Sequence, residues 1–154
     1  MLSPLQPSEV LLAAKALGKD VCPGSDGMGV SWYIEYWDMI GNALTSAYQQ
    51  ILDQGFMPQE WTKGLIYLIP KGDGPLHDIR KWRPITLLNV VYKILAKTIA
   101  RRLQPFLPQL IHDSQTGFLQ ERSIFDNIFL FWEMVATTEQ QQQEDLAILF
   151  LDFE

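Results

Sequence analysis

The sequence has few residues of the kinds that form cross-links. Its 154 residues include one cysteine, Cys22, and two histidines, His77 and His112. A single cysteine excludes a disulfide framework, and so few cysteines and histidines leave a structural zinc site with almost no ligands. Hydrophobic residues make up 47% of the chain, so we expect an apolar core, rather than covalent or metal links, to stabilise the fold.

Membrane spans and a secretory signal are absent as well. The longest apolar runs, such as the one that ends at Leu151, fall far short of the ~20 residues needed to cross a bilayer. Residues 1–9 do not combine a basic segment with an apolar one, as a signal peptide would. We therefore expect an intracellular protein, nuclear or cytoplasmic or both, that is not secreted and has no membrane partner.

Basic residues are in the minority, but they are unevenly distributed. The net charge is −6, yet residues 61–111 contain nine basic and two acidic side chains, between two acidic flanks. Because salt screens charges beyond ~8–10 Å, this middle block can form a local basic surface whatever the total charge. Such a block favours a polyanionic partner such as nucleic acid. A solvated helix face is the alternative, and from charge alone it is the more common outcome.

Apolar residues three or four apart predict helices, and runs of β-branched and aromatic residues predict strands. The expected helices are 9–17 after an N-cap at Ser8, 31–54 before Gly55, 90–103 after Asn89, and 124–136 behind a capping box of Ser123 and Asp126. The expected extended segments are 64–69, the start of 83–88, 115–119 and the apolar run 146–151. The expected links are the glycine-rich 23–29 and the glutamine-rich 137–144.

An acidic residue follows the last apolar run. Asp152 comes directly after six apolar residues, and Glu154 lies two positions further on. Strand ends often carry ligand-binding groups, because a sheet fixes their side chains at the edge of a cleft. A carboxylate there can hold Mg²⁺, which prefers one or two carboxylates together with substrate phosphates. The alternative is an aspartate that only caps a turn, which is the more common role for such a residue seen alone.

Two cations lie beside prolines in the basic block. Lys71 follows Pro70, and Arg83 precedes Pro84, so each is attached to a stiffened stretch of backbone. A lysine and a bidentate arginine placed together can clamp a triphosphate. The alternative is a pair of solvated loop cations, which spacing alone favours. The sequence contains no Walker-type phosphate loop.

A basic stripe also runs along the expected helix 90–103. Lys93, Lys97 and Arg101 recur every four residues, while Val91 and Leu95 begin a separate apolar face. This arrangement favours one basic face for nucleic acid and one apolar face for the core.

Several short motifs follow one another along the chain. They are Pro23-Gly-Ser-Asp-Gly, Gly55-Phe-Met-Pro, Leu68-Ile-Pro-Lys, Trp82-Arg-Pro-Ile-Thr-Leu-Leu-Asn, Gln115-Thr-Gly-Phe, Arg122-Ser-Ile-Phe-Asp-Asn and Phe150-Leu-Asp-Phe-Glu. In this order they resemble the N-terminal part of the reverse transcriptase domain of LINE-type non-LTR retrotransposons, from about Pro23 to Glu154. The ordered series is far more specific than any single motif.

The resemblance implies a partial right-hand polymerase of the α+β class. It places an N-terminal helix and lead-in at 1–22, the fingers at 23–144 and the first palm strand at 145–154. The intact enzyme would act on an RNA template, a DNA primer and a dNTP, with Mg²⁺ or Mn²⁺ as its cofactor.

The resemblance also assigns roles to residues. Asp152 matches the first catalytic aspartate of the palm, which binds metal together with the backbone carbonyl of Phe153, whereas Glu154 is not usually a ligand in this family. Lys71 and Arg83 match residues that contact the phosphates of the incoming nucleotide. The expected template or nucleic-acid contacts are Asn89, the basic stripe of Lys93, Lys97 and Arg101, and a motif between fingers and palm with Gln115, Gly117, Phe118 and Arg122.

Later palm motifs of that family are missing. The chain contains no Asp-Asp pair, and holding two metal ions ~3.5–4 Å apart takes carboxylates from more than one strand. We therefore expect a truncated polymerase fragment that is inactive alone. The alternative is a non-catalytic nucleic-acid-binding or interaction protein derived from such an element. We also expect the run 146–151, as an open-edged strand, to promote aggregation or association.

Overall fold

The computed structural model of the protein describes residues 3–72, 77–117, 119, 121–141 and 147–151. The chain divides into two compact units, Met1–Arg102 and Leu103–Glu154, which are described separately below. Helices together with a β-hairpin confirm the expected α+β class. The three functional segments expected from the sequence remain a prediction. Among the described helices, none is both long enough and apolar enough to cross a membrane.

The first helix, α1 (Pro7–Ala16), begins earlier than expected. Its N-cap is Gln6 rather than Ser8, and the Gln6 N–H donates to Glu9 Oε1 at 2.7 Å. Pro7 occupies the first helical position, where its missing N–H leaves no donor unsatisfied and its fixed φ suits the helix. The proline therefore sets the start of the helix one residue before the serine.

The long helix expected over 31–54 is two helices, α2 (Val30–Glu35) and α3 (Trp37–Gln54). The chain leaves helical geometry at Tyr36, whose φ of −92° and ψ of 15° lie outside the α region. No glycine or proline marks this break in the sequence. The end of α3 is as expected, because Gly55 adopts a φ of +68° and its N–H closes the last turn on Ile51.

The core of the first unit joins α1, α2, α3 and α5 (Val90–Leu103). Val10, Val30, Tyr48 and Ile94, one from each helix, are at most 1% exposed. Burial raises the pKa of Tyr48 well above its usual range, and its hydroxyl donates to the Val91 carbonyl at 2.7 Å. The predicted apolar stripe of the α2–α3 segment is confirmed, since all its members belong to this core: Tyr33, Trp37, Ile40, Leu44, Tyr48 and Ile51.

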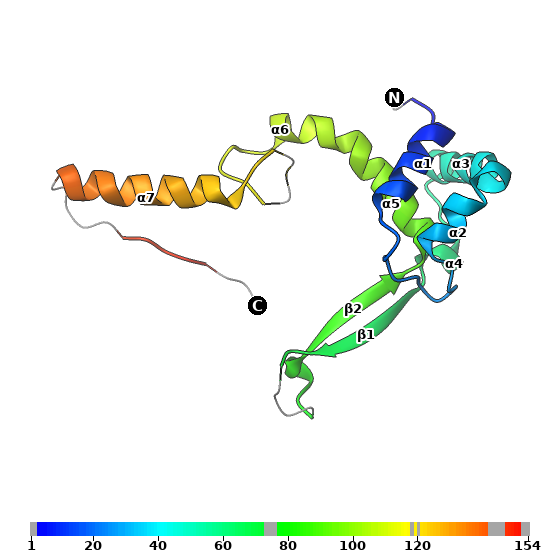
Figure 1. Ribbon diagram of the computed structural model, residues 1–154, viewed down its shortest axis with the longest axis horizontal. Coiled ribbons are helices and arrows are strands. Elements are labelled where there is room, and N and C mark those ends of the chain that lie inside the picture. Colours follow the sequence, from blue (N-terminus) through cyan, green and yellow to red (C-terminus); the bar gives the residue numbers. More distant parts are fainter. Residues whose placement is uncertain (1–2, 73–76, 118, 120, 142–146, 152–154) are drawn as a thin grey trace. The chain divides into compact units, whose positions relative to one another are not determined.

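A β-hairpin projects from these helices (Figure 1). A short helix, α4 (Gln59–Thr62), leads into β1 (Gly64–Pro70), which pairs antiparallel with β2 (Trp82–Leu88). The pairing runs from Gly64 opposite Leu88 to Pro70 opposite Trp82, and a 3-10 turn, η1 (Ile79–Lys81), precedes β2. All of β1 is exposed, so the hairpin is a free-standing ribbon within this unit.

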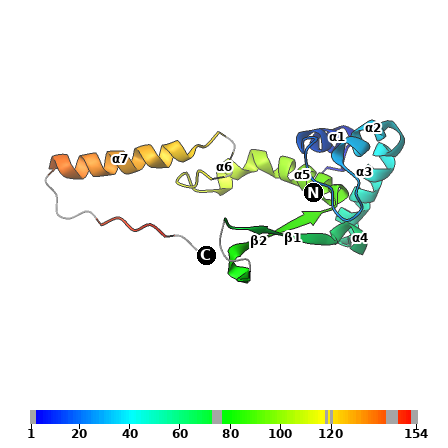
Figure 2. The same cartoon turned by 60° about the horizontal axis from the view of Figure 1, so that its bottom comes forward.

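The second unit contains η2 (Gln104–Phe106), α6 (Leu107–Leu110) and α7 (Ile124–Gln141), which is a straight helix in both views (Figures 1 and 2). The capping box of α7 is confirmed: the Ser123 N–H donates to Asp126 Oδ2 at 3.0 Å, and the Phe125 N–H donates to Ser123 Oγ at 3.3 Å. The helix runs past the predicted end at residue 136 to Gln141, because threonine and glutamine allow the turn to continue.

Two expected extended segments in the second unit are wrong. Gln115 and Thr116 lie in irregular backbone and Gly117 in a turn, where we expected an extended stretch over 115–119. Residues 147–151 have no regular secondary structure, although we expected a strand over 146–151. An apolar run becomes a strand only where another strand offers it hydrogen bonds, and within the described part of the chain none pairs with 147–151.

Candidate nucleic-acid interface

The hairpin brings Lys71 and Arg83 together. Arg83 lies opposite Ile69 in the register. The Lys71 N–H donates to the Lys81 carbonyl at 2.6 Å, so the ladder continues one pair beyond the strands. Side chains two residues apart on a strand share a face, as do directly opposed residues. Lys71 and Arg83 therefore lie on the same face near the loop end of the hairpin.

Both cations are available to a ligand. Lys71 and Arg83 are exposed, and neither has an ion pair or a side-chain hydrogen bond within the described residues. Arg80, nearby, differs because its Nε lies 3.1 Å from Asp78 Oδ1. This hydrogen bond lowers the pKa of the Asp78 carboxyl. Lys81, opposite Lys71, is also exposed and has no ion pair within the described residues. The sequence motifs predict phosphate binding for Lys71 and Arg83.

The side chain of Asn89, at the junction of β2 and α5, points into the interior of the first unit. It is 5% exposed, and its amide donates to the Glu60 carbonyl at 3.0 Å. Its Oδ1 is 3.4 Å from both Ser25 Oγ and the Asp26 N, which are long contacts. Asn89 thus ties the glycine-rich loop and α4 to the start of α5. A template contact for it remains a prediction.

The basic stripe of α5 is only partly free. Lys93 is half-buried, and its Nζ donates to the Cys22 carbonyl at 2.7 Å. Lys97 is half-buried and Arg101 is exposed, and neither has an ion pair in the described part of the chain. The most exposed positive charge of the stripe is therefore Arg101, near the C-terminal end of α5.

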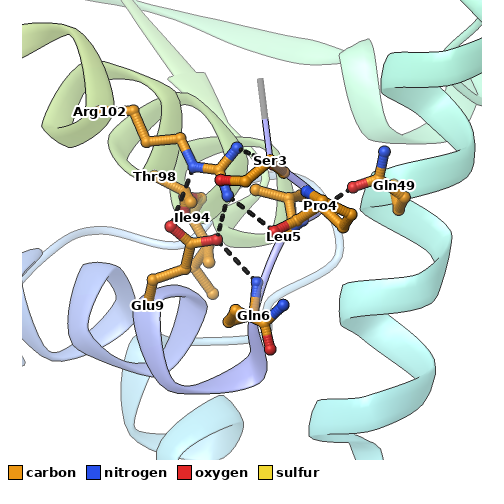
Figure 3. A network of polar contacts seen from close by, with 9 residues as sticks. All are labelled: Ser3, Pro4, Leu5, Gln6, Glu9, Gln49, Ile94, Thr98 and Arg102. Atoms are coloured by element: carbon orange, nitrogen blue, oxygen red, sulfur yellow. Dashed lines mark hydrogen bonds and ion pairs between the residues drawn. The ribbon is translucent and has the colours of Figure 1, made fainter. Parts of the chain in front are cut away.

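Arg102, next to the stripe, belongs to the interior instead (Figure 3). Its guanidinium pairs bidentately with the Glu9 carboxylate and donates to the carbonyls of Ser3 and Pro4. The hydrogen bond from Arg102 lowers the pKa of Glu9, and partial burial of the carboxyl opposes that shift. The sequence analysis counted Arg102 in the basic block. Its charge is neutralised by Glu9, which is too distant in the sequence for this pairing to be predicted.

Arg122, in the second unit, organises the loop between α6 and α7. Its Nη1 donates to the carbonyls of His112 at 2.6 Å and Gln115 at 2.9 Å, and Nη2 lies 3.2 Å from Asp113 Oδ1. The side chain is 16% exposed. Gln115 and Gly117, by contrast, are exposed. A nucleic-acid contact by any of these three stays a prediction, and both terminal nitrogens of Arg122 are already engaged by its own loop.

The expected catalytic and metal-binding positions cannot be placed. Asp152, Phe153 and Phe118 lie outside the described residues. Elsewhere, the described residues contain no group of three carboxylate, imidazole or thiol side chains able to hold a metal ion. A metal at Asp152 therefore rests on the sequence match alone.

Comparisons with known proteins agree with the motifs. The chain is 32% identical over 152 residues, 99% of its length, to the Transposon TX1 uncharacterized 149 kDa protein of Xenopus laevis. It is 28% identical over 97% of its length to a retrovirus-related Pol polyprotein from type-1 retrotransposable element R2 of Popillia japonica. Over 82% of its length it is 27% identical to a probable RNA-directed DNA polymerase from transposon BS of Drosophila melanogaster.

The chain spans only 12%, 20% and 14% of the lengths of these three relatives, respectively. Its residues 69–154, more than half of the chain, match the family described as reverse transcriptase (RNA-dependent DNA polymerase). This stretch begins in β1 and takes in Lys71, Arg83 and the basic stripe. The chain therefore belongs to the reverse transcriptase family and corresponds to a part of non-LTR retrotransposon polymerases.

Proposed function

We propose that the β1–β2 hairpin of this chain holds the triphosphate of the incoming nucleotide in an RNA-directed DNA polymerase. The observation that carries this proposal is the placement of two exposed, unpaired cations, Lys71 and Arg83, on one face near the end of the hairpin. Arginine presents a planar fork that matches two phosphate oxygens, and lysine adds a mobile point charge. Prolines beside both residues limit the movement of the backbone that carries them.

In the intact polymerase, the 3′-hydroxyl of a DNA primer attacks the α-phosphate of a dNTP on an RNA template, and pyrophosphate leaves. We propose that Asp152, with the Phe153 carbonyl, holds Mg²⁺ or Mn²⁺, which neutralises phosphate charge. In this chain, Lys71 and Arg83 bind and orient the β- and γ-phosphates. The positive charges of Lys97 and Arg101 in the first unit contact the template. In the second unit, the uncharged segment Gln115–Gly117 is a separate template contact. Such an enzyme works in the nucleus or the cytoplasm, wherever its template is found.

The test is primer extension by a chimera that joins this chain in register to the palm and thumb of a relative. Replacing Arg83 by Ala should raise the KM for dNTP about 10- to 100-fold with a smaller fall in kcat, since a charged hydrogen bond is worth ~1.5–3 kcal/mol. Lys71→Ala should act in the same direction. Asp152→Asn should abolish extension.

The matched control is Lys63→Ala, which removes a cation beside the opposite end of β1. Lys63 is already paired with Glu60 at 2.8 Å, so nucleotide KM should not change. If Arg83→Ala and Lys71→Ala both leave the KM for dNTP unaltered, the hairpin does not bind the triphosphate. Full extension by the Asp152→Asn chimera would remove the proposed role of that aspartate.

A further inference from the structure

The first unit contains a pocket that the proposed function does not use. It has a volume of about 610 Å³, within the range of pockets that hold small ligands or several side chains. One face of α3 forms its floor, through residues spaced three and four apart: Ile40, Ala43, Leu44 and Ala47. Trp32, Tyr33 and Trp61 also line it. The nucleotide-binding cations of the hairpin do not.

The lining combines small residues with large aromatic ones. Ala43 is exposed and Ala47 is half-buried. Their short side chains leave a depression in the middle of this face of α3. Trp32 stays 39% exposed, although a tryptophan of a folded core is usually covered. Tyr33 is buried at 3% exposure and Trp61 is half-buried, so Trp32 supplies most of the exposed aromatic surface. An exposed aromatic ring beside a depression is typical of surfaces that accept a bulky apolar group from a partner.

Polar groups gather at one part of this pocket. Ser25, Asp26 and Asn89 line it together. The polar atoms of Asn89 already contact Glu60, Ser25 and Asp26, which leaves the Asp26 carboxylate as the exposed charge. Burial, with a smaller contribution from the negative charge of Asp26, raises the pKa of Tyr33 to about 12. The exposed Asp26 carboxylate makes this part of the pocket lining negatively charged.

The segment that builds the pocket is uniformly acidic. Residues 20–62 contain six acidic side chains and no lysine or arginine. Within the described residues, two cations from outside this segment contact it, and both are engaged: Lys63 pairs with Glu60, and Lys93 donates to the Cys22 carbonyl. A phosphate backbone would be repelled here, whereas a cationic partner is attracted. Charge complementarity thus selects the kind of occupant.

We propose that this pocket binds a basic peptide segment of a partner protein, with a large apolar side chain inserted among Trp32, Tyr33 and Trp61 and a lysine or arginine beside Asp26. The apolar side chain removes exposed aromatic surface from water, and the cation supplies specificity. This interaction does not involve the hairpin. The test of peptide binding is therefore independent of the test of the proposed nucleotide site.

The test is selection of a displayed random-peptide library on the full 154-residue chain, followed by synthesis of the enriched peptide. We expect a consensus with a bulky apolar residue close to lysine or arginine. Ala43→Trp, which fills the pocket, should weaken binding of that peptide at least 10-fold in fluorescence polarisation. Asp26→Asn keeps a side-chain oxygen for the Met28 N–H, removes the charge, and should weaken binding several-fold.

Matched controls separate loss of the pocket from loss of fold. Ala16→Trp places the same side chain on the exposed end of α1 and should leave binding unchanged. Trp32→Ala gives a second pocket variant, and all variants are compared by urea unfolding. No enriched peptide, a consensus without cations, or equal binding to Ala43→Trp would overturn the proposal. So would single-stranded RNA that displaces the peptide and loses its own binding in Ala43→Trp, since the pocket would then be a nucleic-acid site.

Discussion

A single arginine fastens the start of the chain to the end of α5. The Arg102 guanidinium contacts Glu9 and the carbonyls of Ser3 and Pro4, and the Leu5 N–H donates to Gln49 Oε1 at 2.8 Å (Figure 3). The side chains of Arg102 and Glu9 are 17% and 29% exposed. Because this pair is largely withdrawn from water, losing one partner leaves the other poorly solvated.

We expect Arg102→Ala to lower the free energy of unfolding by about 2 kcal/mol, measured by urea denaturation. Arg102→Lys should recover only part of the loss. A lysine ammonium lacks the planar fork of the guanidinium, so it cannot contact the carboxylate and both carbonyls at once. Arg101→Ala is the matched control on the neighbouring exposed position and should change stability little. Equal effects of the two alanine variants would contradict the assignment.

The same pair makes stability depend on acid. Arg102 lowers the pKa of Glu9 below its ordinary value of 4.5 in the folded state. A lowered folded pKa gives stability that is present above the unfolded value and is lost as the pH falls through the folded one. The stability difference between the protein and its Glu9→Gln variant should therefore be constant near pH 7 and shrink below about pH 4.5. Urea titrations at several pH values measure it, and a difference that grows on acidification would have the wrong sign.

At the scale of elements, local signals predicted which segments are helical more reliably than where they end. Gly55 and the Ser123–Asp126 box were read correctly, because each acts within a few residues. Tyr36 breaks a helix without any local signal, and the failed strand at 147–151 depends on pairing, which is a long-range property. The candidate site shows the same difference between local and distant signals. Motif order selected Lys71 and Arg83 as candidates, whereas the burial of Asn89 and the partial burial of Arg102 depend on residues far away in the sequence.

One glycine of the loop 23–29 is required by such a distant contact. A Cβ on Gly24 would lie 2.1 Å from Asn89 Oδ1 and 2.5 Å from the Asn89 backbone nitrogen. Backbone atoms at the start of α5 cannot move aside as a flexible side chain would. Gly24 therefore lets the loop approach the helix closely enough for Asn89 to bind both the loop and α4.

We expect Gly24→Ala to destabilise the first unit by about 1–3 kcal/mol, the usual cost of overpacking. Gly29→Ala is the matched control in the same loop, because its Cβ would meet nothing within 4 Å and its φ is −79°. That variant should change stability little, because the lower chain entropy of alanine in the unfolded state is offset by its poorer fit at the N-cap of α2. Thermal unfolding followed by circular dichroism compares the two, and similar midpoints would show that the loop does not pack on α5.

For the whole molecule, exposed apolar side chains extend well beyond the run 146–151. Ile66 and Tyr67 of the hairpin are 68% and 65% exposed, and Phe129 and Trp132 of α7 are both 69% exposed. Apolar surfaces of this kind favour association. We expect the isolated chain to self-associate with rising concentration in light scattering. Phe129→Lys with Trp132→Lys should reduce this more than deletion of residues 146–154; a monomer at high concentration would contradict both expectations.

The basic block gives the last prediction, which concerns the chain as a polyelectrolyte. Despite the net charge of −6, residues 61–111 should let it bind single-stranded RNA weakly, with affinity that falls as salt rises. Each lost phosphate contact lowers the slope of log K against log salt by roughly 0.7 for a single strand. Changing Lys97 and Arg101 to glutamine should therefore flatten the slope by roughly 1.4. Adding Lys93→Gln should flatten it by less than a further ~0.7, because the Lys93 amine already donates to the Cys22 carbonyl.

The control for this experiment changes Lys15 and Lys19 to glutamine, which removes the same amount of charge from the acidic first part of the chain. The slope should then stay as it was, although the net charge of both double variants is the same. If both pairs flatten it equally, RNA responds to the total charge and α5 is no binding surface. A slope that changes only with Lys97 and Arg101 means instead that the position of a charge within the fold, and not the sum over the sequence, decides how this acidic protein meets a polyanion.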